Sequence, residues 1–219
     1  MKILPEPHRY AVCCMDDMPI KEFYKGVFEE VFVILHPFLK HKGSTNNINP
    51  SSEKVTWKQF LSLSGIGNYK QLDIGLRTRI KSLKKEYEDE KTASIIEKIC
   101  RENLIVEPQE GMLPPVIMDD LLKGLQTVGH DWIWIGDEFC TERKLVYIND
   151  LMNDNHLLDQ RKNLFTHDHS ILITTPWDSH FSLLCSNRET VGKLVNLCEL
   201  EGFYCTDKTK INWSTSSDK

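Results

Sequence analysis

The sequence predicts an α+β protein, with a helical N-terminal half packed on a mixed or antiparallel sheet of about five strands in the C-terminal half. Apolar residues recur at helical spacing through much of residues 20–103. Short apolar segments separated by turn residues dominate residues 131–205. The proline-rich and glycine-containing residues 107–115 lie between them. We therefore expect a helical region at 1–106, a linker at 107–115 and a sheet region at 116–219, with one continuous domain as the alternative.

A hairpin is expected at the centre of the sheet. Residues 169–175 and 180–185 are apolar, and the PWDS sequence between them favours a turn. A four-residue loop would place Thr175 opposite His180 and Ile173 opposite Ser182. One face would then carry Ile171, Ile173 and Leu184, and the other Leu172, Phe181, Leu183 and Cys185. Because both faces are apolar, we expect these strands to be covered on both sides.

A helix is predicted directly after the hairpin. Ser186 and Glu189 have the spacing of a capping box, and Gly202 is a natural stop. The apolar stripe between them consists of Val191, Leu194, Val195 and Cys198. Residues 203–205 are expected to form a further strand, with Trp213 packed over the end of the sheet.

The N-terminal half is expected to be helical. Phe23, Val27, Val31 and Leu35 step at intervals of four, which predicts a buried helix over residues 20–35. Thr56 and Gln59 form a second capping box, and helices are also predicted over 72–87 and 92–103. Basic residues on the outer face of the third helix are interpreted as solvent-exposed, with an anion-binding patch as the alternative: Arg77, Arg79, Lys81, Lys84 and Lys85.

The C-terminal half begins with a predicted helix over residues 116–128, which carries Ile117, Leu121 and Leu125 on one face. Strands are expected at 131–136 and 144–148, followed by a short helix within 149–161. Trp132 and Trp134 share one face of the first of these strands. We favour core positions for both, and the alternative is an interaction surface that includes Asp137 and Glu138.

Composition limits the class of protein. The 219 residues are 40% hydrophobic and 27% charged, without an apolar run of about 18 residues that could span a membrane. The first residues lack the apolar segment of a signal peptide, so we expect a cytoplasmic protein. Seven scattered cysteines without a CxxC pair are expected to be free, buried thiols.

Charge differs between the two halves. Residues 1–106 contain 17 Lys and Arg against 14 Asp and Glu, whereas residues 107–219 contain 10 against 18. An acidic half does not favour binding to a nucleic-acid backbone, which requires clustered Lys and Arg. It is compatible with a basic protein partner, and the simpler explanation is an acidic surface that maintains solubility.

Two histidines form the sharpest candidate site. If residues 166–169 continue a strand, His167 and His169 lie on one face and could share a divalent metal, with Asp137, Glu138 or His130 as a further ligand. Histidines hydrogen-bonded at the end of a strand are the simpler interpretation. A nucleophile pair of Cys140 with one of these histidines is a weaker hypothesis. No glycine-rich phosphate loop and no GxSxG motif occurs in the sequence.

Four segments resemble an uncharacterised family of proteins from Bacillus and related Firmicutes: WIWIGDEF, KLVYINDL, THDHSILITTPWDSHFSLLCS and LEGFYCTDKTKINW. The resemblance implies a bacterial cytosolic origin and supplies no catalytic residues. We therefore expect a non-enzymatic binding or interaction protein, such as an immunity-like protein that uses an acidic face against a basic partner. The alternative is a metal-dependent enzyme of the hydrolase type centred on His167 and His169. The sequence indicates no other cofactor and does not predict the oligomeric state.

Overall fold

The computed structural model describes residues 10–40, 52–153 and 163–215. Its helices are α1 (Ile20–Phe23), α2 (Trp57–Ser64), α3 (Tyr69–Arg79), α4 (Glu90–Asn103), α5 (Pro115–Thr127), α6 (Ile148–Asn153) and α7 (Arg188–Leu197), with a 3-10 turn at Lys85–Tyr87. Its strands are β1 (Glu30–Leu35), β2 (Phe38–Lys40), β3 (Glu53–Val55), β4 (Ile105–Val106), β5 (Trp132–Gly136), β6 (Arg143–Tyr147), β7 (Asn163–Thr166), β8 (Leu172–Thr174), β9 (Phe181–Ser186) and β10 (Gly202–Tyr204).

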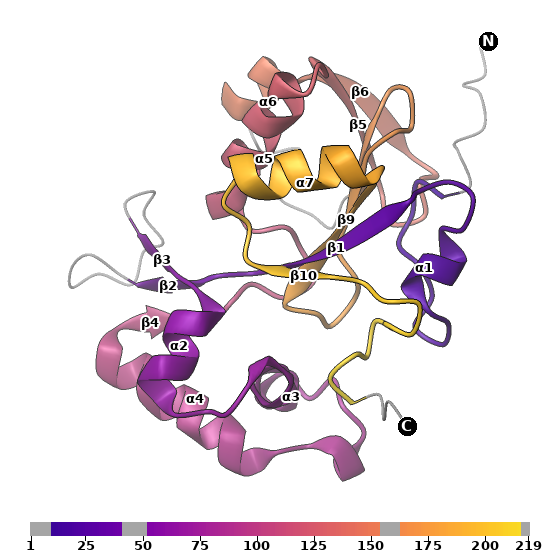
Figure 1. Ribbon diagram of the computed structural model, residues 1–219. Coiled ribbons are helices and arrows are strands. Elements are labelled where there is room, and N and C mark those ends of the chain that lie inside the picture. Colours follow the sequence, from indigo (N-terminus) through magenta and orange to yellow (C-terminus); the bar gives the residue numbers. More distant parts are fainter. Residues whose placement is uncertain (1–9, 41–51, 154–162, 216–219) are drawn as a thin grey trace.

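Seven of the strands form one antiparallel sheet in the order β10-β1-β9-β8-β7-β5-β6. A smaller antiparallel sheet has the order β3-β2-β4. Figure 1 shows α5, α6 and α7 together on one side of the large sheet, with α2, α3 and α4 on the opposite side. The large sheet is therefore the middle layer of three.

Alternating side chains of the strands supply two hydrophobic cores. In β1, Val31, Val33 and Leu35 pack with residues of α1 to α4, whereas Phe32 and Ile34 pack with residues of α5 and α7. All six residues of β1 are buried. A central strand covered by helices on both faces has this uniformly buried composition.

The predicted division into a helical half and a sheet of about five strands is wrong. Residues 30–35 form β1, which lies between β9 and β10, and helices occur in both halves of the chain. Helical spacing was misleading here because a strand buried on both faces is apolar at every position, including positions four apart. The helix that does form, α1, ends at Phe23, and Gly26 follows with φ of 81°. The division at residues 107–115 stays a prediction, although strands from both sides of it share the large sheet.

The central hairpin is confirmed with a shifted register. Ile173 pairs with Leu184 and Thr174 with Leu183, two residues away from the expected pairing with Ser182. A shift of two keeps every side chain on its predicted face, and both faces are buried. The longer loop is closed by a hydrogen bond of 2.7 Å between the hydroxyls of Thr175 and Ser182.

Of the two predicted capping boxes, one is confirmed and the other is wrong. The capping box of Thr56 and Gln59 begins α2 as expected. Ser186 instead ends β9, and its hydroxyl donates to the Ser170 carbonyl at 2.7 Å. Asn187 caps α7 by accepting from the Thr190 amide at 2.8 Å. Gly202 begins β10 rather than ending the helix, which stops at Leu197. Glycine is needed at this position because the Cβ of any larger residue would collide with the Val33 carbonyl.

Arg77 is buried, which contradicts its predicted position on a solvent-exposed helix face. Its guanidinium donates to Asp73 at 3.0 Å, to Ser179 at 3.0 Å and to Asn212 at 3.1 Å. It also lies 5.9 Å from the centre of the Phe181 ring. These contacts join α3 to the loop between β8 and β9 and to the C-terminal segment.

Two buried histidines lie at the same end of the β8–β9 hairpin. The His36 ring bonds the Gln109 carbonyl through Nδ1 at 2.7 Å and the Ser182 hydroxyl through Nε2 at 2.8 Å. The His180 carbonyl accepts from the His36 amide. Nδ1 of the His180 ring has no hydrogen-bond partner among the described residues. Burial lowers the pKa of His36 to about 4 and that of His180 to about 3.

All seven cysteines lie in the part of the chain that the structure describes, and they are free thiols. Six are buried and Cys13 is partly exposed, as the scattered spacing predicted. None of the helices in the described ranges is long and apolar enough to cross a membrane.

Candidate interaction surface

Strands β5 and β6 place their alternate side chains on two different faces. Trp132 pairs with Tyr147, Trp134 with Leu145 and Gly136 with Arg143, so these side chains share one face. The intervening residues Ile133, Ile135 and Val146 belong to the core beneath α5 and α6. We call the first group the aromatic face and define it as Trp132, Trp134, Arg143, Leu145 and Tyr147.

The aromatic face remains partly accessible to solvent. The Trp132 side chain is 50% exposed, and the other four residues are half-buried. Trp132 and Tyr147 have ring centres 5.3 Å apart, and the Arg143 guanidinium lies 5.7 Å from the centre of the Trp134 ring. The favoured assignment of both tryptophans to the core is therefore wrong for Trp132. Trp134 is intermediate, because it stacks on the buried Phe165 ring at 6.2 Å.

The segment that carries this face is acidic in sequence. Residues 131–153 contain five acidic side chains, Asp131, Asp137, Glu138, Glu142 and Asp150, and two basic ones, Arg143 and Lys144. Asp137 accepts from the Thr141 amide at 2.7 Å and so stabilises the turn between β5 and β6. Glu138 accepts a hydrogen bond from the indole nitrogen of Trp177, which is itself 59% exposed. Asp137 and Glu138 therefore lie at the turn after β5, at the opposite end of that strand from Trp132.

The two candidate metal ligands lie in a turn and not in a strand. Strand β7 ends at Thr166, and the His169 amide donates to the Thr166 carbonyl at 2.9 Å. His169 has φ of 59°, and its ring stacks on Phe165 at 5.5 Å. The strand alternation that was expected to align His167 with His169 is therefore absent.

Asp168, between these histidines, holds the turn together. Its carboxylate accepts from the Thr166 hydroxyl at 2.7 Å and from the Ser170 amide at 3.0 Å. Burial raises the pKa of this carboxyl, but the hydrogen bonds and the nearby His130 outweigh it and lower the pKa overall. Across residues 10–40, 52–153 and 163–215, no three His, Cys, Asp or Glu side chains form a group suited to a metal ion. Metal binding by His167 and His169 stays a prediction.

Cys140 lies in the turn between β5 and β6, where it is 1% exposed. Burial raises the pKa of its thiol, and Asp137 adds to that effect while Arg143 opposes it. A raised pKa disfavours the thiolate that a nucleophile requires. The geometry therefore gives no support to a nucleophilic role for Cys140.

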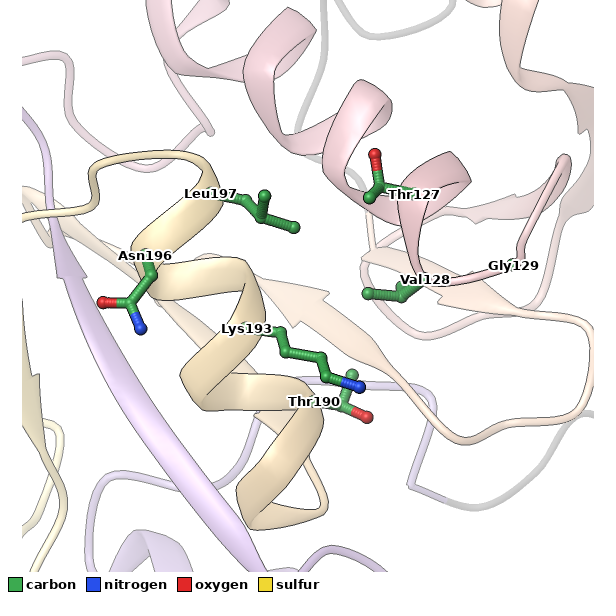
Figure 2. Close-up of a pocket in the computed structure, with 7 residues that line it drawn as sticks. All are labelled: Thr127, Val128, Gly129, Thr190, Lys193, Asn196 and Leu197. Atoms are coloured by element: carbon green, nitrogen blue, oxygen red, sulfur yellow. The ribbon is translucent and has the colours of Figure 1, made fainter.

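A groove of about 720 Å³ lies between the end of α5 and α7. Figure 2 shows Leu197 and Lys193 extending from α7 toward Thr127 and Val128. Lys193 forms an ion pair of 2.6 Å with Glu189, so its charge is already partnered. A smaller hollow of about 280 Å³ lies between α3 and α4, where Arg79 pairs with Glu97. The smaller hollow is lined mainly by polar and charged side chains, but Arg79 also pairs with Glu107 at 2.7 Å, so its charge is already neutralised. Neither hollow therefore gives a specific indication of a ligand.

Residues 16–215 match the sequence profile of a family described as "Protein of unknown function (DUF2711)". The chain belongs to this family. The match covers both halves of the chain and all ten strands of the structure. The expected resemblance to an uncharacterised family is thus confirmed.

The chain is also similar to a protein from Bacillus subtilis (strain 168) that is named "Uncharacterized protein YwbB". The two chains are 20% identical over 216 residues, which cover 90% of this chain and 96% of the relative. No solved structure matches this member of the DUF2711 family. The physical arrangement of side chains therefore has to support any proposal about function.

Proposed function

We propose that this protein is a binding protein that holds a basic segment of another protein against its aromatic face. The half-exposed Trp132 beside Tyr147 is the observation that carries the proposal. Tryptophan and tyrosine are enriched among the few residues that supply most of the binding energy at protein interfaces, because they bury large areas with little loss of conformational freedom.

Charge supports a basic partner. The five carboxylates and two basic side chains of residues 131–153, which include β5, β6 and α6, give this segment a net charge of −3. Opposite charge on a partner would accelerate association and select against acidic competitors. Arg143 is the basic residue of the aromatic face, and its guanidinium lies 5.7 Å from the centre of the Trp134 ring.

The test begins with a photo-crosslinking amino acid placed at position 132 in the organism that carries the protein. The same label at position 87 is the control, because Tyr87 is 46% exposed on a different part of the surface. A protein captured only from position 132 is then purified and titrated against wild type and variants. We expect Trp132→Ala to weaken binding by roughly 30-fold, as for a central interface tryptophan, and Tyr87→Ala to have no effect.

Electrostatic attraction is tested in the same titration. Glu142→Gln is expected to weaken binding by a few-fold, and the affinity should fall as salt is added. The proposal is overturned if the two positions capture the same proteins, if position 132 captures none, or if the captured protein binds Trp132→Ala as tightly as wild type.

A further inference from the structure

Strand β6 lies at one end of the large sheet and pairs with β5 on its inner side. Within the described ranges, no strand pairs with its outer side. An edge strand exposes backbone groups that can pair with another extended chain. The question is which residues of β6 offer those groups.

Two hydrogen bonds fix the direction of each backbone group in β6. The Ile148 amide donates to the Asp131 carbonyl at 2.9 Å, and the Asp137 amide donates to the Glu142 carbonyl at 2.9 Å. Bonded pairs alternate along an antiparallel ladder, so Lys144 and Val146 also direct their backbone groups toward β5. Arg143, Leu145 and Tyr147 therefore direct their amides and carbonyls outward, away from the sheet.

The same three residues belong to the aromatic face. Arg143, Leu145 and Tyr147 alternate with Lys144 and Val146, and their side chains lie beside Trp132 and Trp134. A strand added along β6 would bond to the outward backbone groups. Every second side chain of that strand would then contact the aromatic face. Backbone pairing and side-chain recognition are available at one site.

We propose that β6 is a docking edge to which an extended basic segment of another protein adds as an eighth strand, through Arg143, Leu145 and Tyr147. The inference deepens the proposed function and rests on it. Charge selects this occupant over a second copy of the chain. Pairing two β6 edges would bring together two regions that each carry a net charge of −3, which is unfavourable.

The test uses the full chain as bait for a random peptide library displayed on phage. Selected peptides are expected to be basic, with apolar residues at alternate positions. Leu145→Pro removes one outward amide and leaves the bonds to β5 in place, because proline is tolerated in an edge strand whose N–H faces solvent. Leu145→Ala is the matched control, since it shortens the side chain and keeps the amide.

We expect Leu145→Pro to weaken peptide binding by about tenfold and Leu145→Ala by about threefold or less. Thermal unfolding and circular dichroism check that the proline variant is folded. N-methylation of the selected peptide provides a second measurement that leaves the protein unchanged. Methyl groups on one alternate set of its amides should abolish binding, and those on the other set should have little effect.

The outcomes separate the two proposals. If Trp132→Ala weakens peptide binding but Leu145→Pro acts no more strongly than Leu145→Ala, and both N-methylated peptides bind alike, strand addition is refuted and the proposed function stands. If no peptide is selected, or Trp132→Ala has no effect, both are refuted. Self-association that Leu145→Pro abolishes would show that a second copy occupies the edge, which also refutes the inference.

Discussion

Replacing His36 by glutamine should reduce the loss of stability that the protein suffers in mild acid. The His36 ring is fully buried, and burial lowers its pKa from 6.5 to about 4, although the bond to the Gln109 carbonyl opposes the shift. The unfolded chain therefore binds a proton near pH 6.5 that the native ring does not accept. Stability contributed by neutral His36 is present above pH 6.5 and is lost as the pH falls toward 4.

The magnitude follows from proton linkage. With these pKa values, His36 lowers the free energy of unfolding by about 2 kcal/mol between pH 7 and pH 5. Burial, reinforced by the neighbouring His36 and Arg77, lowers the pKa of His180 to about 3, and this residue contributes a similar loss of about 2 kcal/mol. Wild type should therefore lose about 4 kcal/mol from these two residues, and His36→Gln about half of that.

Urea unfolding at the two pH values measures this difference. Ser182→Ala is the matched control, because it removes the hydroxyl that bonds His36 Nε2 and keeps the titrating ring. That variant should be less stable than wild type at pH 7 by about 1 kcal/mol but retain most of the acid-dependent loss. Equal losses for wild type and His36→Gln would refute the reasoning.

Three further predictions concern buried groups. Arg77→Met should lower the free energy of unfolding by about 3–5 kcal/mol in urea, because it leaves the Asp73 carboxylate buried without its cation; a loss below about 1 kcal/mol would contradict this. Gly202→Ala should separate β10 from β1 and lower the melting temperature, since its methyl group meets the Val33 carbonyl; an unchanged melting temperature would show that the strands adjust freely. With a thiol reagent, only the partly exposed Cys13 should react rapidly in the native protein, and rapid reaction of several thiols would contradict the packing.

The sequence predicted the faces of the central hairpin because side chains alternate strictly along a strand. Ile173 and Leu184 fall on the same face in both the expected and the observed register, because the two registers differ by two residues. The register itself depended on the loop, where the hydroxyls of Thr175 and Ser182 bond and so extend the turn. Although Thr175 and Ser182 belong to the same hairpin, the local sequence does not show whether they close a longer loop or pair within the strands.

The first strand was missed for a different reason. Spacing alone does not separate a helix from a strand that is buried on both faces. The β-branched residues Val31, Val33 and Ile34, after the turn at Gly26, were the available signals. A helix predicted in place of β1 makes the N-terminal half look more helical than it is.

For the interaction surface, the sequence placed Trp132 and Trp134 on one face and Asp137 and Glu138 nearby. It did not predict that β6 is the edge strand, because strand order depends on contacts distant in the sequence. The alternation of Leu145 and Tyr147 with Lys144 and Val146 was a signal for their shared face. Which backbone groups point outward requires the hydrogen bonds themselves.

The position of β1 between β9 and β10 affects how the protein forms during synthesis. Its pairing partners begin at Phe181 and Gly202, about 150 and about 170 residues later in the chain, and contacts this distant slow folding. The apolar EVFVIL segment therefore leaves the ribosome long before either partner strand is made. Nascent chains of this protein should depend on chaperones to protect that segment, and fragments that end before β9 should aggregate.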